Sequence, residues 1–240
     1  MWAHDIWDDS IMTMQTGKLI VLDGGDGAGK ATQVALLVKQ LLADGYKVET
    51  LDFPQYTQNT FGALLRECLD GKRGDFMATD ARIASTLYAA DRFESKPRLE
   101  SWLKEGKIVV LDRYVSSNMM HQGAKIQNAD ELEAFLGWLD HMEHGVFGLP
   151  RPDIILYLEV PFAVRQKLKN DAVAAGKHGA DVKLDVAEAD HNHQEQVEIR
   201  AKTIVSSKNN WQVVHCCEQD SIRSREAIHS DVYKTIKGIL

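Results

Sequence analysis

A glycine-rich loop holds the residues in this sequence whose types and spacing are best suited to chemistry. The stretch GGDGAGKAT places Gly24, Gly29 and Lys30 at the spacing G-x-x-x-x-G-K. In such a loop the backbone N–H groups converge on phosphate oxygens, the following helix adds its positive N-terminal end, and the lysine reaches the outer phosphates. A plain glycine turn is the alternative. The strand-like run before the loop and the helical run after it favour a phosphate site.

The residue after the lysine departs from this motif. That position is normally Ser or Thr, whose hydroxyl ligates Mg²⁺, but here it is Ala31. Thr32 has a hydroxyl, yet the helical rotation of one residue is expected to turn it away from a bound nucleotide. Because Mg²⁺ prefers to keep several waters, a water held by an acid such as Asp112 can replace the lost ligand. We therefore expect a weakened but working metal site.

Alternating strands and helices are expected to position the loop. The apolar run KLIVLD at 18–23 is typical of a strand buried on both faces of a parallel sheet. Apolar residues then recur with a helical period until Asp44-Gly45 ends the pattern. Further strands are expected at 47–53, 107–112, 153–160 and 211–216. Because parallel neighbours need right-handed crossovers that cover both faces, the five strands predict a doubly wound parallel sheet flanked by helices.

The domain organisation follows from one composition break. Residues 1–16 are interpreted as an N-terminal extension, and 17–240 as a single domain. The segment 170–195 is polar and poor in bulky apolar residues, which predicts a mobile lid between two helices. Its run Asp190-His191-Asn192-His193, with His178, is interpreted as solvated rather than metal-binding, because residues two apart do not share a helix face.

Composition limits the class of protein. A chain of 240 residues with 44% hydrophobic content can bury a substantial core. The net charge of −7 argues against non-specific nucleic-acid binding, while a small anionic ligand needs only a few local cations. The three cysteines form neither a paired framework nor a CxxC site. With no secretory signal and no apolar run of membrane-spanning length, we expect a cytoplasmic protein with reduced thiols.

Four more stretches accompany the loop and narrow the interpretation. In chain order the set is DGGDGAGKATQ (23–33), DFP (52–54), LYAADRFE (87–94), LDRYVSSN (111–118) with HQGAK (121–125), and LPRPDIILYLEVP (149–161). From about Lys18 through the C-terminal helix the chain resembles the thymidylate kinases, which are P-loop nucleoside monophosphate kinases. The resemblance implies phosphoryl transfer from ATP to dTMP with Mg²⁺ as cofactor. It also implies a cytoplasmic homodimer that binds small nucleotides and neither nucleic acid nor membrane.

Two of these stretches have a physical interpretation of their own. Tyr88 and Arg92 are four apart on an expected helix and so share one face, where a ring and a guanidinium can stack on a base and hydrogen-bond its carbonyl. From spacing alone a core tyrosine and a surface arginine are favoured, and the resemblance reverses that interpretation. Asp112 and Arg113 follow an expected strand, at the sheet edge where ligands bind in open parallel sheets.

The resemblance also implies roles for individual residues. Lys30 and the loop amides hold the ATP phosphates, and Arg113 steadies the acceptor phosphate and the transferring group. Asp26 contacts the 3′-hydroxyl of the acceptor sugar. The implied ATP site is Gly24, Gly25, Asp26, Gly27, Ala28, Gly29, Lys30, Ala31 and Thr32. The implied acceptor site is Asp26, Phe53, Pro54, Tyr88, Arg92, Arg113, Asn118 and Gln122, with Asp112 at the metal.

The sequence departs from the family pattern at several further places. Gln55 and Tyr56 stand where the family has an arginine for the acceptor phosphate, so that phosphate falls more heavily on Arg113, with Arg66 as a substitute. His121 replaces a Tyr or Phe near the sugar, which weakens any inference of discrimination against ribose. The lid has lysines instead of arginines, and which nearby cation closes on ATP stays open among Arg165, Lys169, Lys177 and Lys183.

Two other functions remain as alternatives. The acceptor can be another pyrimidine monophosphate, such as dUMP. Alternatively, Ala31 and the missing arginine mark a catalytically silent nucleotide-binding protein.

Overall fold

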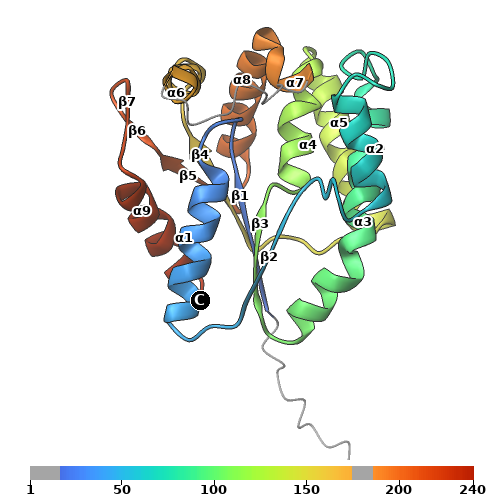
Figure 1. Ribbon diagram of the computed structural model, residues 1–240. Coiled ribbons are helices and arrows are strands. Elements are labelled where there is room, and N and C mark those ends of the chain that lie inside the picture. The colour runs from blue at the N-terminus through green and yellow to red at the C-terminus, as the bar shows by residue number, and fades with distance from the viewer. Residues whose placement is uncertain (1–16, 175–185) are drawn as a thin grey trace, which may run out of the picture.

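A computed structural model describes residues 17–174 and 186–240, and its centre is a parallel sheet with helices on both faces (Figure 1). The sheet has five strands in the order β2-β3-β1-β4-β5. Their bounds are β1 Lys18–Asp23, β2 Val48–Asp52, β3 Ile108–Asp112, β4 Ile154–Glu159 and β5 Trp211–His215. The predicted doubly wound sheet and all five of its strands are confirmed.

The register of the strands brings three loops to one edge of the sheet. β1 lies in the middle and pairs in parallel with β3 and β4, so that Leu22 stands opposite Asp112. On the other side of β3, Asp52 of β2 also stands opposite Asp112. The chain segments that follow β1, β2 and β3 therefore begin side by side at the carboxyl edge, where open parallel sheets bind ligands.

Helices cover the two faces of the sheet. α1 and α9 lie together on one side, while α3 and α5 lie on the other (Figure 1). The longer helices are α1 Lys30–Ala43, α2 Thr60–Leu69, α3 Ala81–Lys104, α5 Ala129–Asp140, α6 Phe162–Ala174, α8 His191–Ser207 and α9 Arg225–Lys237. Short elements are α4 Val115–His121, the 3₁₀ turn η1 Gly123–Lys125, the π-helical turn η2 His141–Val146 and α7 Val186–Ala189.

Alternation along β1 divides the core into two layers. Ile20 and Leu22 pack with Leu37 and Leu41 of α1, whereas the odd-numbered Leu19 and Val21 pack against the layer that holds α3, α5 and α8. Both sets are almost fully buried. A strand buried on both faces has to be apolar at every position, and this explains the uninterrupted run of hydrophobic residues before the glycine loop.

The structure departs from the sequence expectations at two places. Within the expected lid 170–195, α6 reaches Ala174 and helices α7 and α8 begin at Val186 and His191, so the regular structure is more extensive than expected. Residues 175–185 of that lid, and the 1–16 extension, lie outside the described residues. A small antiparallel ribbon, β6 Cys217–Glu218 with β7 Ser221–Ile222, precedes α9 and was not expected. Across the described ranges, none of the helices has both the length and the apolar character needed to cross a bilayer.

Candidate active site

A cavity of about 1080 Å³ opens at the carboxyl edge of the sheet. It is bounded by the glycine loop, by the ends of β2 and β3, and by α3 and α4. Most of the site residues expected from the sequence line it, namely Asp26, Gly27, Ala28, Gly29, Lys30, Ala31, Thr32, Phe53, Pro54, Tyr88, Arg92, Asp112, Arg113, Asn118 and Gln122. Gly24 and Gly25 are not part of the lining. Thr32 does line the cavity, which corrects the expectation that it turns away from the ligand space.

The glycine loop is shaped by residues in the left-handed region. Gly27 has a φ of 83° and Gly29, the N-cap of α1, has a φ of 87°. Glycine adopts this conformation without the steric cost that a side chain adds. The loop therefore turns tightly enough for its backbone to face the cavity at the start of α1.

Lys30 is the first residue of α1 and is buried against the loop. Its Nζ donates hydrogen bonds to the carbonyls of Gly24 and Gly25, each at 3.0 Å. Burial, followed by the repulsion of the Arg113 charge, lowers the pKa of Lys30 to about 8. The ammonium group thus stays largely protonated at neutral pH while it stands at the cavity wall.

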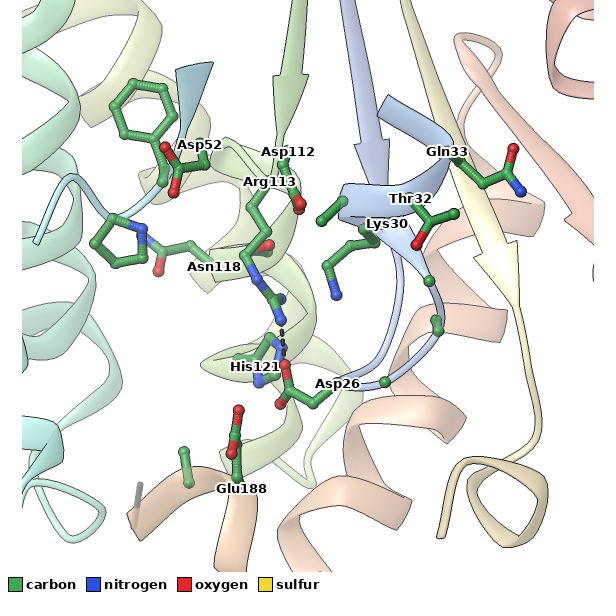
Figure 2. A pocket seen from close by; sticks show the side chains of 18 of the residues that line it. Asp26, Lys30, Thr32, Gln33, Asp52, Asp112, Arg113, Asn118, His121 and Glu188 are labelled. Carbon is green, nitrogen blue, oxygen red and sulfur yellow. Dashed lines mark hydrogen bonds and ion pairs between the residues drawn. The ribbon is translucent and has the colours of Figure 1, made fainter. Parts of the chain in front are cut away.

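Asp26 and Arg113 form an ion pair at the centre of the site, and Figure 2 shows both side chains beside Lys30 and His121. Arg113, directly after β3, has a φ of 66°, which is unusual for a residue other than glycine. Burial alone would raise the pKa of Asp26, but the charges of Arg113 and Lys30 hold it well below its usual range. Asp26 is therefore an anion between two cations. Backbone strain of this kind is found at functional sites.

Asp23 fixes the start of the loop to α4. This carboxylate is completely buried at the end of β1 and accepts hydrogen bonds from Ser116 Oγ at 2.5 Å and Ser117 Oγ at 2.8 Å. It also accepts one from the Gly24 backbone N–H at 2.9 Å. A buried carboxylate is tolerated when it is hydrogen-bonded in this way, so Asp23 links the loop to the helix after β3.

On the opposite side of the cavity, Tyr88 and Arg92 come from one face of α3, as expected. Arg92 is buried and donates through Nε to Glu143 Oε2 at 2.9 Å, with a second contact from Nη2 to Oε1. Asn118 Nδ2 reaches the same carboxylate at 3.3 Å. Burial disfavours the charged guanidinium, but Glu143 outweighs that effect and raises the pKa of Arg92. Glu143 lies in η2 and was not identified from the sequence.

His121 and His193 meet between α4 and α8, with their ring centroids 5.8 Å apart. His193 is buried, which corrects the expectation of a solvated histidine. Burial lowers the pKa of His121 to about 3 even though Asp26 opposes the shift, so its imidazole is neutral. The Nε2 atom of His121 is buried and has no hydrogen-bond partner in the described residues. This ring lines the cavity as a neutral polar surface beside Asp26.

The other cations expected near the site from the sequence do not line the main cavity in the described residues. Arg66 is outside the cavity lining and pairs with Asp70, 2.6 Å away, and its role as a substitute at the acceptor side stays a prediction. Arg165 packs against the glycine loop from outside the cavity. Lys169 lies 3.9 Å from Glu188. The remaining two lid cations, Lys177 and Lys183, fall in the undescribed segment.

Asp112 is the acid expected to support a metal ion. It lines the cavity, and burial raises its pKa although Lys30 and Arg113 act in the opposite direction. Within residues 17–174 and 186–240, no three His, Cys, Asp or Glu side chains are grouped to hold a metal. Magnesium binds through one or two carboxylates when phosphates and waters supply the other ligands. A single carboxylate beside the loop fits that mode.

Several lining residues were not identified from the sequence. Beyond the loop, Ile222, Arg223, Arg225 and Ile228 of the β7–α9 region form part of the wall. The β6–β7 ribbon brings these residues to the cavity, and its two-residue strands are too short to be recognised as strands in the sequence. The same cavity therefore has lining residues from the β7–α9 region as well as Tyr88 and Arg92 of α3.

Known proteins resemble this chain over most of its length. The family model described as thymidylate kinase matches residues 22–226. Thymidylate kinase of Homo sapiens is 32% identical over 221 residues, which cover 92% of this chain and 90% of the human protein. Thymidylate kinase of Mycobacterium tuberculosis H37Rv is 32% identical over 186 residues, or 77% of this chain and 81% of that protein.

A solved structure of thymidylate kinase from Candida albicans shares the fold. It matches with a TM-score of 0.72 at 22% identity and covers 93% of this chain and 92% of the other. At this level of identity the match concerns the architecture alone.

Proposed function

Because the chain belongs to the thymidylate kinase family, we infer that it transfers the γ-phosphoryl group of ATP to dTMP and forms ADP and dTDP. One observation carries the inference. The loop with Lys30 and the pair Tyr88–Arg92 line the same cavity, and Arg113 lies in its wall at the end of β3. A donor phosphate on the loop and an acceptor nucleotide on α3 would thus approach each other next to the Arg113 guanidinium.

The reaction leaves little covalent chemistry to the protein. In phosphoryl transfer, catalysis is mostly the positioning of donor and acceptor and the stabilisation of charge on the transferring oxygens. In our proposal the loop amides and Lys30 hold the donor phosphates, while Arg113 binds the acceptor phosphate and the transferring group. Asp26, already ionised, accepts a hydrogen bond from the sugar hydroxyl of the acceptor and keeps Arg113 directed into the cavity.

The acceptor base is proposed to lie against α3 and α4. Tyr88 supplies a ring for stacking, and Phe53 and Pro54 form the facing wall. Asn118 Nδ2 already donates to Glu143 Oε1 and to the Ser85 carbonyl, each at 3.3 Å. The Asn118 carbonyl is then the group available to a base N–H, while the Arg92 guanidinium faces a base carbonyl.

Magnesium is proposed as the cofactor, bound through Asp112. A bound Mg²⁺ would supply positive charge that neutralises the phosphates, and Asp112 would hold it. Asp112 is suited to hold it through water because it ends β3 beside the loop and lines the same cavity. With Ala31 at the usual hydroxyl position, the chain has one ligand fewer at this place, and a higher Mg²⁺ requirement is the expected consequence.

A homodimer in the cytoplasm completes the proposal. Three large apolar side chains, Phe61 of α2 with Ile83 and Phe93 of α3, are exposed on neighbouring helices. The family resemblance favours their burial against a second copy. All three cysteines are free, as a reducing compartment requires. Light scattering after size exclusion measures the mass, and F93D should reduce it if this face is the contact.

Purified protein tests the function directly. With ATP and Mg²⁺, ADP is expected to form with dTMP and much less with dUMP, dCMP or AMP. The Candida albicans enzyme is known for broad substrate specificity, which makes the acceptor panel informative. Nucleotide binding without turnover would support the silent alternative instead. Lys30→Ala and Arg113→Ala should each abolish most turnover, and full activity in either would contradict the mechanism.

A further inference from the structure

Arg165 is a buried cation in contact with the outer side of the glycine loop. It belongs to the first turn of α6 and is only 5% exposed. Its Nη1 donates to the backbone carbonyl of Asp26 at 3.1 Å, and its Nε donates to the carbonyl of Val160 at the same distance. It lines a small recess together with Asp26 but is not part of the main cavity lining. Arg165 thus contacts the loop on the side that faces away from the main cavity.

This contact fixes the orientation of one peptide group. A trans peptide is planar, so the C=O of one residue and the N–H of the next point in opposite directions. When Arg165 holds the Asp26 carbonyl on the outer side, the Gly27 N–H points to the inner side, where Gly27 lines the cavity. An N–H in this position is the type of group that binds a phosphate oxygen.

The loop needs such outside contacts because its own residues restrain it weakly. Glycine has more backbone freedom than any other residue, and Gly25 precedes Asp26 while Gly27 supplies the N–H of the peptide in question. Lys30 already binds the carbonyls of Gly24 and Gly25 from within. Arg165 binds the carbonyl of the next residue, Asp26. Three consecutive carbonyls of the loop therefore accept hydrogen bonds from the two cations Lys30 and Arg165.

A second feature shows that the loop is shaped to receive Arg165. A Cβ placed on Gly25 would lie 2.4 Å from the Cζ and Nη1 atoms of Arg165, with no backbone among its nearest neighbours. Gly25 does not have a positive φ, so alanine is compatible with its backbone. The space that glycine leaves at this position is occupied by the guanidinium.

Gln194 of α8 holds the same loop residue by its side chain. Its Nε2 donates to Asp26 Oδ2 at 3.0 Å, and its Oε1 accepts from Arg165 Nη1 at 3.3 Å. The guanidinium also lies 3.7 Å from Glu198 Oε2 in α8. Asp26 is therefore held through its main chain by α6 and through its carboxylate by α8 and Arg113.

From these contacts we propose that Arg165 is a positioning residue of the phosphate-binding loop. It keeps the Asp26–Gly27 peptide turned so that the Gly27 N–H faces the donor phosphates, and it places a positive charge behind them. The ATP part of this inference rests on the proposed function, whereas the contact between Arg165 and the loop does not.

Two single variants and their combination test the proposal. R165M removes the guanidinium and keeps an apolar chain of similar length, while G25A leaves Arg165 in the sequence but displaces its guanidinium from the loop. Each should weaken ATP binding and lower kcat/KM for ATP by about 10- to 100-fold, the value of one charge-assisted hydrogen bond. The double variant should lose no more than the worse single variant, because both changes remove the same contact. R165K should recover part of the loss.

Three further measurements separate positioning from a general loss of structure. KM for dTMP should change less than KM for ATP, because Arg113 and Gln194 still hold the Asp26 carboxylate. K202M is the matched control. Lys202 is a cation that pairs with Glu198 at 2.9 Å but does not touch the loop, so this variant should keep wild-type kinetics. Calorimetric titration with ATP alone reports the loop contact even if dTMP is not the acceptor, so the two proposals fail separately.

The outcome that overturns the proposal is specific. ATP affinity within about twofold of wild type in both R165M and G25A would show that the loop does not depend on this contact. A double variant whose loss equals the product of the two single losses would show that the changes act independently. If R165M fails to fold, G25A decides the question, because it keeps Arg165 and every side chain around it, and ATP affinity within about twofold of wild type in G25A would then overturn the proposal.

Discussion

Replacement of Glu143 by glutamine should cost the protein a large part of its stability. Glu143 is fully buried, and its partner Arg92 has a side chain that is only 3% exposed. Glu143→Gln keeps the volume but leaves the guanidinium without an opposing charge. Breaking one partner of a buried ion pair costs about 3–5 kcal/mol. That is a substantial fraction of the roughly 5–15 kcal/mol by which domains are stable.

Urea denaturation followed by circular dichroism measures the effect. The matched control is Asp140→Asn, which breaks the pair between Asp140 and Arg151, with distances of 2.7 and 2.8 Å but side chains that are 42% and 63% exposed. An exposed pair of this kind contributes only about 0–1 kcal/mol. The double variant R92M/E143M should be more stable than E143Q, because it leaves no buried charge behind.

The same variant should affect the acceptor more than the donor. Glu143 holds Arg92 and also receives Asn118 Nδ2, so both groups lose their fixed orientation in E143Q. KM for dTMP should rise while KM for ATP changes little. A loss of stability below about 1 kcal/mol in E143Q would place it with exposed pairs and refute the reasoning.

Three further results are expected. Restoring the hydroxyl with Ala31→Thr should lower the Mg²⁺ concentration needed for half-maximal rate, and an unchanged Mg²⁺ titration would count against the metal argument. ATP affinity should fall as the pH rises through about 8, because the folded-state pKa of Lys30 lies there and only the protonated amine attracts phosphate; calorimetry between pH 6.5 and 9.5 tests this, and a flat profile would be inconsistent with it. Ser116→Ala should lower the free energy of unfolding by about 1.5–3 kcal/mol, because buried Asp23 loses a hydrogen bond to a charged group; a thermal melt superimposable on wild type would argue against that role.

The sheet was predictable because its signal is local. In β1 all positions after Lys18 are buried, so the run from Leu19 to Leu22 is apolar without interruption, and β3 and β4 are marked in a similar way. The loop itself is recognisable because its chemistry depends on glycine and lysine at fixed spacing. Elements whose structure follows from neighbouring residues were therefore found within a residue or two of their bounds.

The ties between distant parts of the chain were not predictable. Glu143 is 51 residues from Arg92, and Arg165 is 139 residues from Asp26. No periodicity links such pairs, and single charged residues more often lie at the surface. Only the fold brings them together, so the supports behind the site appear once α6, α8 and η2 are placed.

The helical pattern of α8 contains a signal for the burial of His193. The local sequence is polar and suggested a solvated segment. Yet His193, Val197, Ala201 and Ile204 follow one another at helical spacing, and all four are buried on one face of α8. Extending the helical pattern towards the N-terminus from the apolar residues would have placed the histidine inside.

The small ribbon before α9 gives the protein a natural place for a reporter group. Cys217 of β6 is the partly exposed thiol, whereas Cys68 and Cys216 are buried. Burial raises the pKa of Cys216 to about 12, and its thiolate, the reactive form, is correspondingly scarce. Cys217 pairs across the ribbon with Ile222, which lines the cavity. A fluorophore introduced through the native thiol at Cys217 would therefore sit one strand away from the cavity wall and signal the arrival of a nucleotide without any engineered cysteine.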